Sequence, residues 1–317
     1  MASAPAATAT RSDPTHPPEA SGVRAGSGPA GRRRAQHHAL TVDVEDWYHD
    51  SHFDTPAAGH RVEANTDRLL ELFAQCEAKA TFFFLGEVAE RSPALARRVC
   101  AAGHEIGSHG YRHRRVGELT RQEFRDDVTR SLRVIEDITG ARVRGYRAPY
   151  FSIKAGVRWP VEILAECGLS YDASILASDR PPGLELVCPR RPFRLSSGLW
   201  EVPVAILQVG RFWHFPLASG AGLRILPPRL LERFILRFEK DVGAGVFYLH
   251  PWELDPQSPT APGPAHWFLR VGRDKLAERL VQLLRGRRFA SVVEVFASTL
   301  GESDPSGRER TPTTGHL

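Results

Sequence analysis

The stretch Thr81-Phe82-Phe83-Phe84-Leu85, residues 81–85, decides the fold class of this chain of 317 residues. A short apolar run of this kind is typical of a buried strand. It follows a helical pattern in which Asn65 or Thr66 can serve as the N-cap and which ends near Lys79. The two segments together form one helix–strand unit, the building block of a parallel sheet.

The same alternation of helices and strands continues along the chain. Pro93 starts a second helix, Gly103 ends it, and the short strand Glu105-Ile106-Gly107-Ser108-His109 follows. Further helices are predicted at 120–139, at 157–167 and from Pro227, and further strands at 169–174, at 200–207, at 246–250 as the last strand, and in a segment that ends at 146–150. This order predicts one α/β domain with a largely parallel sheet, and a barrel of ordinary size would use nearly all of the chain.

Acidic residues crowd at the end of the first predicted strand. The run 39–47 alternates apolar and polar residues and places Asp43, Glu45 and Asp46 within four positions. Three carboxylates this close together repel one another, so the cluster favours a bound cation. Polar residues that follow parallel strands collect at one end of a barrel, where such enzymes place their catalytic groups.

Two histidines offer further ligands for such a cation. His109 and His113 lie four residues apart in the run Ser108-His109-Gly110-Tyr111-Arg112-His113. Neutral imidazoles are common ligands of divalent metals, and a carboxylate from elsewhere can complete the site. The pattern therefore predicts a site for a divalent metal ion.

The two ends of the chain differ in composition from the rest. Residues 1–37 are rich in Ala, Pro, Ser, Thr and Gly without a periodic apolar face, and 301–317 look similar, so we expect both to be disordered beside a domain at 38–300. Five arginines against two acids in residues 1–38 carry much of the net charge of +5, so we expect no nucleic-acid partner. No apolar run reaches the roughly 18 residues of a membrane span and no signal segment is evident, which favours the cytoplasm; a periplasmic or peripheral membrane location stays open.

Five motifs follow one another in a recognisable order: Asp43–Asp46, His109 with His113, Arg147-Ala148-Pro149-Tyr150, Asp172, and Leu249-His250. This order resembles that of the NodB-like polysaccharide deacetylases, the fourth family of carbohydrate esterases, over roughly residues 38–255. The stretch 248–255, with a basic helical extension from about 256 to Phe289, is similar more narrowly to the exosortase-associated exopolysaccharide deacetylases.

The resemblance implies a distorted (β/α) barrel and a divalent metal, usually zinc, held by an aspartate and two histidines. It implies hydrolysis of the acetamide of N-acetylated sugars in a polysaccharide, in which the metal polarises the carbonyl and a carboxylate takes a proton from water. The implied roles are those of base for Asp43, of general acid for His250, of orienting the base for Arg147, of tuning the general acid for Asp172, and of an oxyanion contact for Tyr150. Trp252 lies beside the last motif, where its ring can pack on a sugar or in the core.

The sequence around the expected third metal ligand differs from the family's usual pattern, in which two adjacent aspartates are followed by Gly-Pro. Glu45 and Asp46 are both candidates here, because strand alternation puts Glu45 on the face of Asp43, whereas Asp46 lies where the strand turns. We prefer Asp46 and keep Glu45 as the alternative. Gly110 also replaces the usual Ser or Thr between the two histidines, which frees the turn.

Two other functions stay open. One alternative is a hydrolase of cyclic amides such as allantoin, an activity found in relatives with the same fold. Some of those relatives do not need the metal ligands, so the presence of both His109 and His113 argues against this alternative. A non-catalytic glycan-binding or assembly component is the other, and the presence of base, metal and acid candidates argues against it. The expected partners are a polysaccharide or oligosaccharide substrate and the machinery of exopolysaccharide biosynthesis.

Overall fold

The computed structural model describes residues 37–49, 61–176, 189–209, 213–215, 218–257 and 270–301. The strands of its main sheet are β1 (His37–Val44), β2 (Thr81–Phe84), β3 (Glu105–Ser108), β4 (Gly145–Tyr146), β5 (Tyr171–Asp172), β6 (Phe193–Arg194), β7 (Trp200–Glu201), β10 (Val246–Leu249) and β11 (Arg288–Ala290). They follow the order β10-β1-β2-β3-β4-β5-β7-β6, and β11 pairs with the first residues of β1. All these pairs are parallel except β6 with β7. A separate antiparallel pair consists of β8 (Leu207–Val209) and β9 (Trp213–Phe215).

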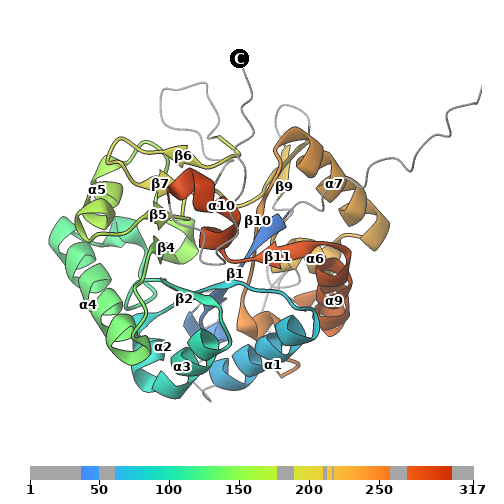
Figure 1. The fold of residues 1–317 in the computed structure, drawn as a ribbon, viewed down its shortest axis with the longest axis horizontal. Helices are drawn as coiled ribbons and strands as arrows, with labels where there is room; N and C mark the ends of the chain where they lie inside the picture. The colour runs from blue at the N-terminus through green and yellow to red at the C-terminus, as the bar shows by residue number, and fades with distance from the viewer. Residues whose placement is uncertain are drawn as a thin grey trace, which may run out of the picture. The chain divides into compact units, whose positions relative to one another are not determined.

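Helices connect the strands and lie around the outside of the sheet (Figure 1). The helices are α1 (Val62–Gln75), α2 (Gly86–Arg91), α3 (Pro93–Ala101), α4 (Arg121–Thr139), α5 (Arg158–Glu166), α6 (Gly220–Ile225), α7 (Pro228–Asp241), α9 (Leu276–Gly286) and α10 (Val292–Leu300). Short 3-10 turns are η1 (Trp47–His49), η2 (Val116–Glu118), η3 (Pro149–Phe151), η4 (Pro251–Leu254) and η5 (Arg273–Lys275). The predicted capping box is present at the start of α4, where Thr120 and Glu123 exchange hydrogen bonds, and Gly140 ends the helix in the left-handed conformation.

The parallel sheet curves into an incomplete barrel. Where a regular strand would be needed to close it, Val204 makes single parallel bridges to Leu176 on one side and to Val246 of β10 on the other. This arrangement confirms the prediction of a distorted (β/α) barrel. Residues from Ala35 onward form one compact unit.

Helix α10 covers the end of the barrel at which the strands begin. The backbone N–H of Val292 donates to Thr81 Oγ1 at 2.8 Å, and that of Val293 donates to Glu105 Oε2 at 3.1 Å. Thr81 and Glu105 are the first residues of β2 and β3. Figure 1 shows α10 inside the ring of outer helices. The carboxyl ends of the strands, where polar residues were predicted to collect, therefore lie at the opposite end.

Two predicted boundaries are wrong, each for a physical reason. Helix α1 begins at Val62 rather than after Asn65 or Thr66, because Asp46 accepts backbone N–H groups at its start. The predicted strand 200–207 is broken: β7 ends at Glu201, and Pro203 has no N–H group with which to continue the ladder.

The region predicted as a basic helical extension from about 256 also contains a strand. Within it, α9 and α10 flank β11, and β11 extends the sheet beside His37–Ala39. The sequence predicted 246–250 as the last strand, and this prediction is wrong because β11 follows it. Of the predicted arm at 1–37 and tail at 301–317, all but His37 and Gly301 lie outside the described residues.

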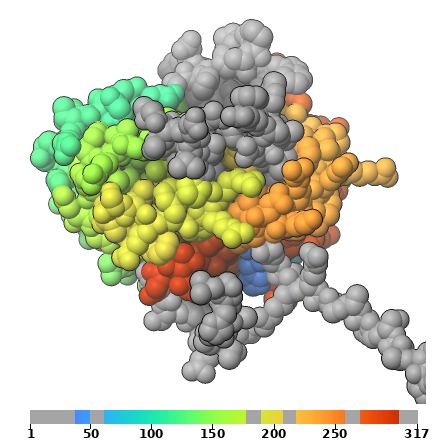
Figure 2. All heavy atoms as spheres, turned by 90° about the horizontal axis from the view of Figure 1, so that it is seen from above, coloured from blue at the N-terminus to red at the C-terminus, as the bar shows by residue number. Residues whose placement is uncertain are grey.

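On the face shown in Figure 2, residues 189–206 (yellow) lie beside residues 218–241 (orange). The two segments meet where Arg191 Nη2 donates to the carbonyl oxygen of Asp241 at 3.2 Å. Across the described parts of the chain, none of the helices has both the length and the apolarity that crossing a bilayer requires.

Candidate active site and metal centre

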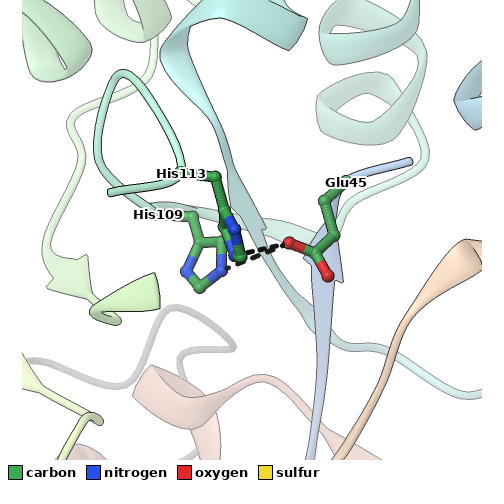
Figure 3. A group of neighbouring side chains, drawn as sticks. All are labelled: Glu45, His109 and His113. Atoms are coloured by element: carbon green, nitrogen blue, oxygen red, sulfur yellow. Dashed lines mark ion pairs between the residues drawn. The ribbon is translucent and has the colours of Figure 1, made fainter. Parts of the chain in front are cut away.

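Glu45, His109 and His113 bring their ligand atoms together at the open end of the barrel (Figure 3). Glu45 follows β1, and both histidines follow β3. The Nε2 atom of His113 lies 2.7 Å from Glu45 Oε2, and that of His109 lies 3.9 Å from the same oxygen. Two imidazoles and one carboxylate form the three-ligand set of hydrolytic zinc sites, which leave a position open for water or substrate.

Backbone carbonyl groups fix the orientation of both imidazoles. His109 Nδ1 lies 2.7 Å from the carbonyl oxygen of Arg147, and His113 Nδ1 lies 2.8 Å from that of His49. Because a carbonyl oxygen only accepts, Nδ1 must carry the hydrogen, and each neutral ring presents the lone pair of Nε2. Histidines that bind metals generally donate their other ring N–H in this way.

The surroundings of Glu45 indicate that a cation belongs between these groups. Its Oε2 is buried, and the His113 ring, with Nε2 at 2.7 Å, is the one group among the described residues that faces it closely. Burial alone would raise the pKa of Glu45, but the charges of His113, His250 and His109 lower it well below its usual range. The donor set therefore fits a divalent ion.

The surroundings of the two histidines shift their pKa values in opposite directions. Burial lowers the pKa of His109 to about 4. Burial also opposes the charged form of His113, but the charge of Glu45 and the hydrogen bond with it raise the pKa of His113 above its ordinary value. A metal ion at His113 therefore competes with the proton that Glu45 favours on this ring.

Asp46 does not lie with the two histidines. Its Oδ1 accepts the backbone N–H of Trp47 at 3.0 Å, and its Oδ2 accepts those of Arg61 at 2.9 Å and Val62 at 3.1 Å. These bonds occupy the buried carboxylate as the N-terminal cap of α1. The sequence-based preference for Asp46 as the third ligand is corrected by this geometry, which favours the alternative, Glu45.

Asp43 and Arg147 form a buried ion pair beside this cluster. Arg147 Nη1 donates to Asp43 Oδ1 at 2.8 Å and to Thr41 Oγ1 at 2.8 Å, while its Nε donates to the carbonyl oxygen of Ala173 at 3.1 Å. Such a fixed guanidinium holds the carboxylate in one orientation. The other oxygen of Asp43, Oδ2, lies 3.9 Å from His250 Nε2. The structure thus brings Arg147 to the predicted base as the sequence implied.

His250 lies beside Asp43 at the end of β10. Its Nε2 is 3.7 Å from Glu45 Oε1, and its Nδ1 is 3.0 Å from Glu253 Oε1. Burial would lower the pKa of His250, but the hydrogen bond with Glu253 and the nearby carboxylates of Glu45 and Asp43 raise it to about 9. The imidazole is therefore protonated at neutral pH, as a general acid must be.

Glu253, rather than Asp172, contacts this histidine. Asp172 is fully buried, accepts the Ser174 hydroxyl, and makes no hydrogen bond or ion pair with His250 among the described residues. Burial raises the pKa of Asp172 to about 6. The role of tuning the general acid, implied for Asp172, has no direct contact with His250 behind it among the described residues, and Glu253 makes that contact instead.

Sequence reasoning missed Glu253 as the residue that orients His250. Glu253 is itself held in place by a buried ion pair with Arg224. Glu253 Oε2 accepts from Arg224 Nε at 3.0 Å, and both side chains are almost fully buried. The signal in the sequence is the three-residue spacing in His250-Pro251-Trp252-Glu253, because Glu253 Oε1 also accepts the backbone N–H of His250 at 3.2 Å. This is the spacing of a capping box at the start of η4.

Part of the predicted set lines one pocket of about 260 Å³. Its lining includes six residues that the sequence singled out: Asp43, Glu45, His109, His113, Tyr150 and His250. Arg115, Phe151 and Tyr248 also line the pocket and were not predicted as site residues.

Trp252 supports the site instead of lining the pocket. Its side chain is buried, its ring stacks on that of His250 with the centroids 5.1 Å apart, and its Nε1 donates to Glu45 Oε1 at 3.2 Å. Of the two roles that the sequence leaves open for Trp252, this placement favours packing in the core over contact with a sugar, because the side chain is buried.

Two backbone conformations shape the pocket. Tyr150 has φ 57° and ψ 19°, a left-handed conformation that is uncommon for a bulky residue and that occurs at functional sites. Gly110 has φ 79°, and a Cβ atom there would lie 2.9 Å from Asp127 Oδ2. A side chain at this position would therefore strain the turn that joins His109 to His113.

Comparison with known proteins places this site in a family. Residues 32–171 match the polysaccharide deacetylase family, over the part of the chain that holds Asp43, Glu45 and both histidines. This chain carries a polysaccharide deacetylase domain. Residues 176–297 match a second family, described as a domain of unknown function.

Three curated relatives share about a third of their aligned residues with this deacetylase domain. The peptidoglycan deacetylase of Helicobacter pylori is 32% identical over 120 residues, which are 38% of this chain and 40% of the relative. The peptidoglycan-N-acetylglucosamine deacetylase of Bacillus cereus is 32% identical over 98 residues, which are 31% of this chain and 36% of the relative. The chitooligosaccharide deacetylase of Sinorhizobium fredii is 32% identical over an alignment of 143 positions, which covers 39% of this chain and 66% of the relative. The matched stretches thus span well under half the length of the first two relatives.

A solved structure supports the fold over nearly the whole chain. The crystal structure of a Mycobacterium smegmatis protein assigned to the polysaccharide deacetylases has a TM-score of 0.59 and 22% sequence identity, and it covers 92% of this chain and 99% of its own. The similarity therefore includes the region that matches the domain of unknown function.

Proposed function

We propose that this protein removes acetyl groups from N-acetylated sugars of a polysaccharide in a metal-dependent reaction. The observation that carries the proposal is that one pocket is lined by a cluster of two histidines and a carboxylate, by Asp43, which is paired with Arg147, and by His250, whose Nε2 lies 3.9 Å from Asp43 Oδ2. Hydrolysis of an amide needs one group that takes a proton from water and another that gives a proton to the departing amine. The named activities of the relatives support an acetamide as the bond that is broken.

Glu45, His109 and His113 would hold the divalent ion, for which we propose zinc because of the two nitrogen donors. When bound, the ion supplies Lewis-acid polarisation of the acetamide carbonyl and of water. Asp43 is oriented by Arg147 through Oδ1, so Oδ2 is the oxygen that accepts the proton of the attacking water.

His250 would complete the reaction as the proton donor. As the C–N bond breaks, Nε2 of the imidazolium gives its proton to the sugar nitrogen, so that acetate and a free amine leave. Glu253, through Nδ1, holds the ring in the orientation that points Nε2 at Asp43 and Glu45. We also propose that the backbone N–H of Tyr150, in its strained turn, stabilises the oxyanion that forms from the carbonyl oxygen.

For the polymer itself we propose an exopolysaccharide, with the biosynthetic machinery as partner. This finer proposal rests on the sequence of residues 248–255. A hydrolase of cyclic amides is disfavoured because the pocket combines a metal-ligand cluster with an acid and a base. A non-catalytic glycan-binding component is disfavoured by the same combination.

Metal analysis combined with an acetate assay tests the proposal. The purified protein should contain about one divalent ion per chain and should release acetate from chito-oligosaccharides. A chelator should abolish the release, and added zinc should restore it. His113→Ala should lose both the metal and the activity. Acetate release at full rate from metal-free protein would overturn the metal dependence, and no release from any N-acetylated glycan would overturn the reaction.

A further inference from the structure

Arg115 lines the pocket, and its role is not explained by the reaction. Its guanidinium lies over the ring of Tyr150, 3.7 Å from the centroid. The ring of His113 lies 4.4 Å from the same tyrosine ring. The ring of Tyr150 therefore separates the positive charge of Arg115 from the metal-ligand cluster. Arg115 lines the pocket in which the sugar would bind.

This guanidinium has no acidic partner among the described residues. The neighbouring Arg114 differs, because its Nη1 lies 3.8 Å from Glu123 and its Nη2 donates to the carbonyl oxygen of Glu118. No hydrogen bond or ion pair within the described ranges occupies the donors of Arg115. The five N–H donors of a guanidinium match the two oxygens of a carboxylate, and such paired hydrogen bonds are among the stronger ones.

The backbone around Arg115 is held in place. The next residue, Val116, donates its N–H to Ser152 Oγ at 3.0 Å, which ties this segment to the turn that carries Tyr150. The short helix η2 begins at Val116 and leads into the capped start of α4. Stacking on Tyr150 further restricts the side chain, so binding a ligand costs less conformational entropy than at a free surface arginine.

The charges in the pocket favour an anionic ligand. Asp43 is neutralised by Arg147, and Glu45 faces His113 and the proposed metal ion. With a divalent ion in place, Arg115 adds to a positive balance that no described acid in the pocket offsets. A neutral sugar would make no use of that charge.

We infer that the glycan carries a carboxylate close to the acetamide and that Arg115 binds it. The inference rests on the proposed function, because it names the substrate class of the same site. The pocket volume of about 260 Å³ leaves room for little more than one sugar unit. The carboxylate therefore belongs to the acetylated sugar or to its immediate neighbour, as in a polymer with uronic acids or with muramic acid.

Matched oligosaccharides and matched variants test this inference. The substrates are chitotetraose, which is neutral, a tetrasaccharide of alternating N-acetylglucosamine and glucuronate, and a disaccharide that contains N-acetylmuramic acid. The variants are Arg115→Gln, Arg115→Lys and the control Arg114→Gln, which removes the same charge one residue away and outside the pocket. Both kcat/KM for acetate release and Kd by calorimetry are measured, and thermal unfolding checks that each variant is folded.

The wild type should favour at least one of the two carboxylate-bearing sugars over chitotetraose, and which one it favours distinguishes the two sources. Arg115→Gln should lower that preference roughly 10- to 100-fold, the loss expected for a hydrogen-bonded charge pair, and Arg115→Lys should lower it less. Arg114→Gln should keep the preference.

Equal losses on acidic and neutral sugars in Arg115→Gln would show that the arginine only supports Tyr150, and this would overturn the inference. A wild type without any preference for acidic sugars would also overturn it. If no sugar releases acetate, the proposed function fails by itself, and the calorimetric preference for the acidic sugars still decides the role of Arg115.

Discussion

Replacing Glu253 by Gln should move the alkaline limit of activity to lower pH. Glu253 Oε1 lies 3.0 Å from His250 Nδ1, and Oε2 accepts from Arg224 Nε at 3.0 Å. Against the effect of burial, the bond to Glu253 and the nearby carboxylates raise the pKa of His250 to about 9. Glutamine has nearly the same size and still offers an oxygen, but it carries no charge.

The size of the effect follows from the lost charge. A hydrogen bond to a charged group contributes roughly 1.5–3 kcal/mol. Since about 1.36 kcal/mol corresponds to one pKa unit, the pKa of His250 should fall by about one to two, to roughly 7–8. The protonated imidazole is the donor, so activity is lost as pH rises through this pKa. At about pH 8.5 most of the wild type still carries the proton, whereas the variant does not, and kcat/KM should be roughly ten-fold lower.

Acetate release between about pH 6 and pH 10, at equal metal content, measures this change. Asp255→Asn is the matched control. Asp255 lies two residues after Glu253 and forms a bidentate ion pair with Arg61, but it does not contact His250. That variant should lose stability and keep the alkaline limit of the wild type. If the Glu253→Gln protein folds and keeps the alkaline limit of the wild type, His250 is not the proton donor that Glu253 orients.

Three further substitutions separate the roles of neighbouring residues. Glu45→Gln should lose most of the bound metal in mass-spectrometric analysis, whereas Asp46→Ala should keep it and lower the free energy of unfolding by about 1–3 kcal/mol in chemical denaturation, because a helix cap is lost; the opposite pattern would restore Asp46 as the ligand. Asp43→Asn should lower kcat about 10²- to 10⁴-fold and retain the metal, and a fully active variant would exclude Asp43 as the base. Gly110→Ala should weaken metal binding in competition with a chelator, because φ 79° and the contact with Asp127 force the turn to shift, and unchanged affinity would contradict this.

The fold was predictable where the deciding signal is local. The capping box at Thr120 and Glu123 and the helix-ending Gly140 act within one turn of the chain, so α4 could be placed from its sequence. The start of α1 could not, because its cap is the carboxylate of Asp46, which the fold brings from the end of β1. A cap that comes from a distant position leaves no pattern in the helix itself.

The site shows the same division. Asp43 lies near the carboxyl end of β1 and His109 directly follows β3, so the parallel sheet alone brings them to one end of the barrel. The choice between Glu45 and Asp46 depended on which carboxylate the start of α1 occupies, and that contact is tertiary. The contact of Glu253 with His250 was missed for a different reason. The two residues are only three positions apart, but Glu253 is not part of the motifs that the resemblance supplied.

The pairing of β1 with β10 connects the two matched regions into one candidate active site. Parallel register sets Val42 opposite Leu249, so the next residues, Asp43 and His250, emerge side by side at the open end of the barrel. Asp43 belongs to the polysaccharide deacetylase match and His250 to the match of unknown function. The second region also supplies Glu253, which holds the imidazole, and strands of the same sheet. In the proposed mechanism the first region alone can hold the metal and take up a proton, but the donor to the leaving amine comes from the second. The region of unknown function is therefore a structural half of the barrel, and a substitution that shifts β10 against β1 would separate acid from base while leaving the metal ligands untouched.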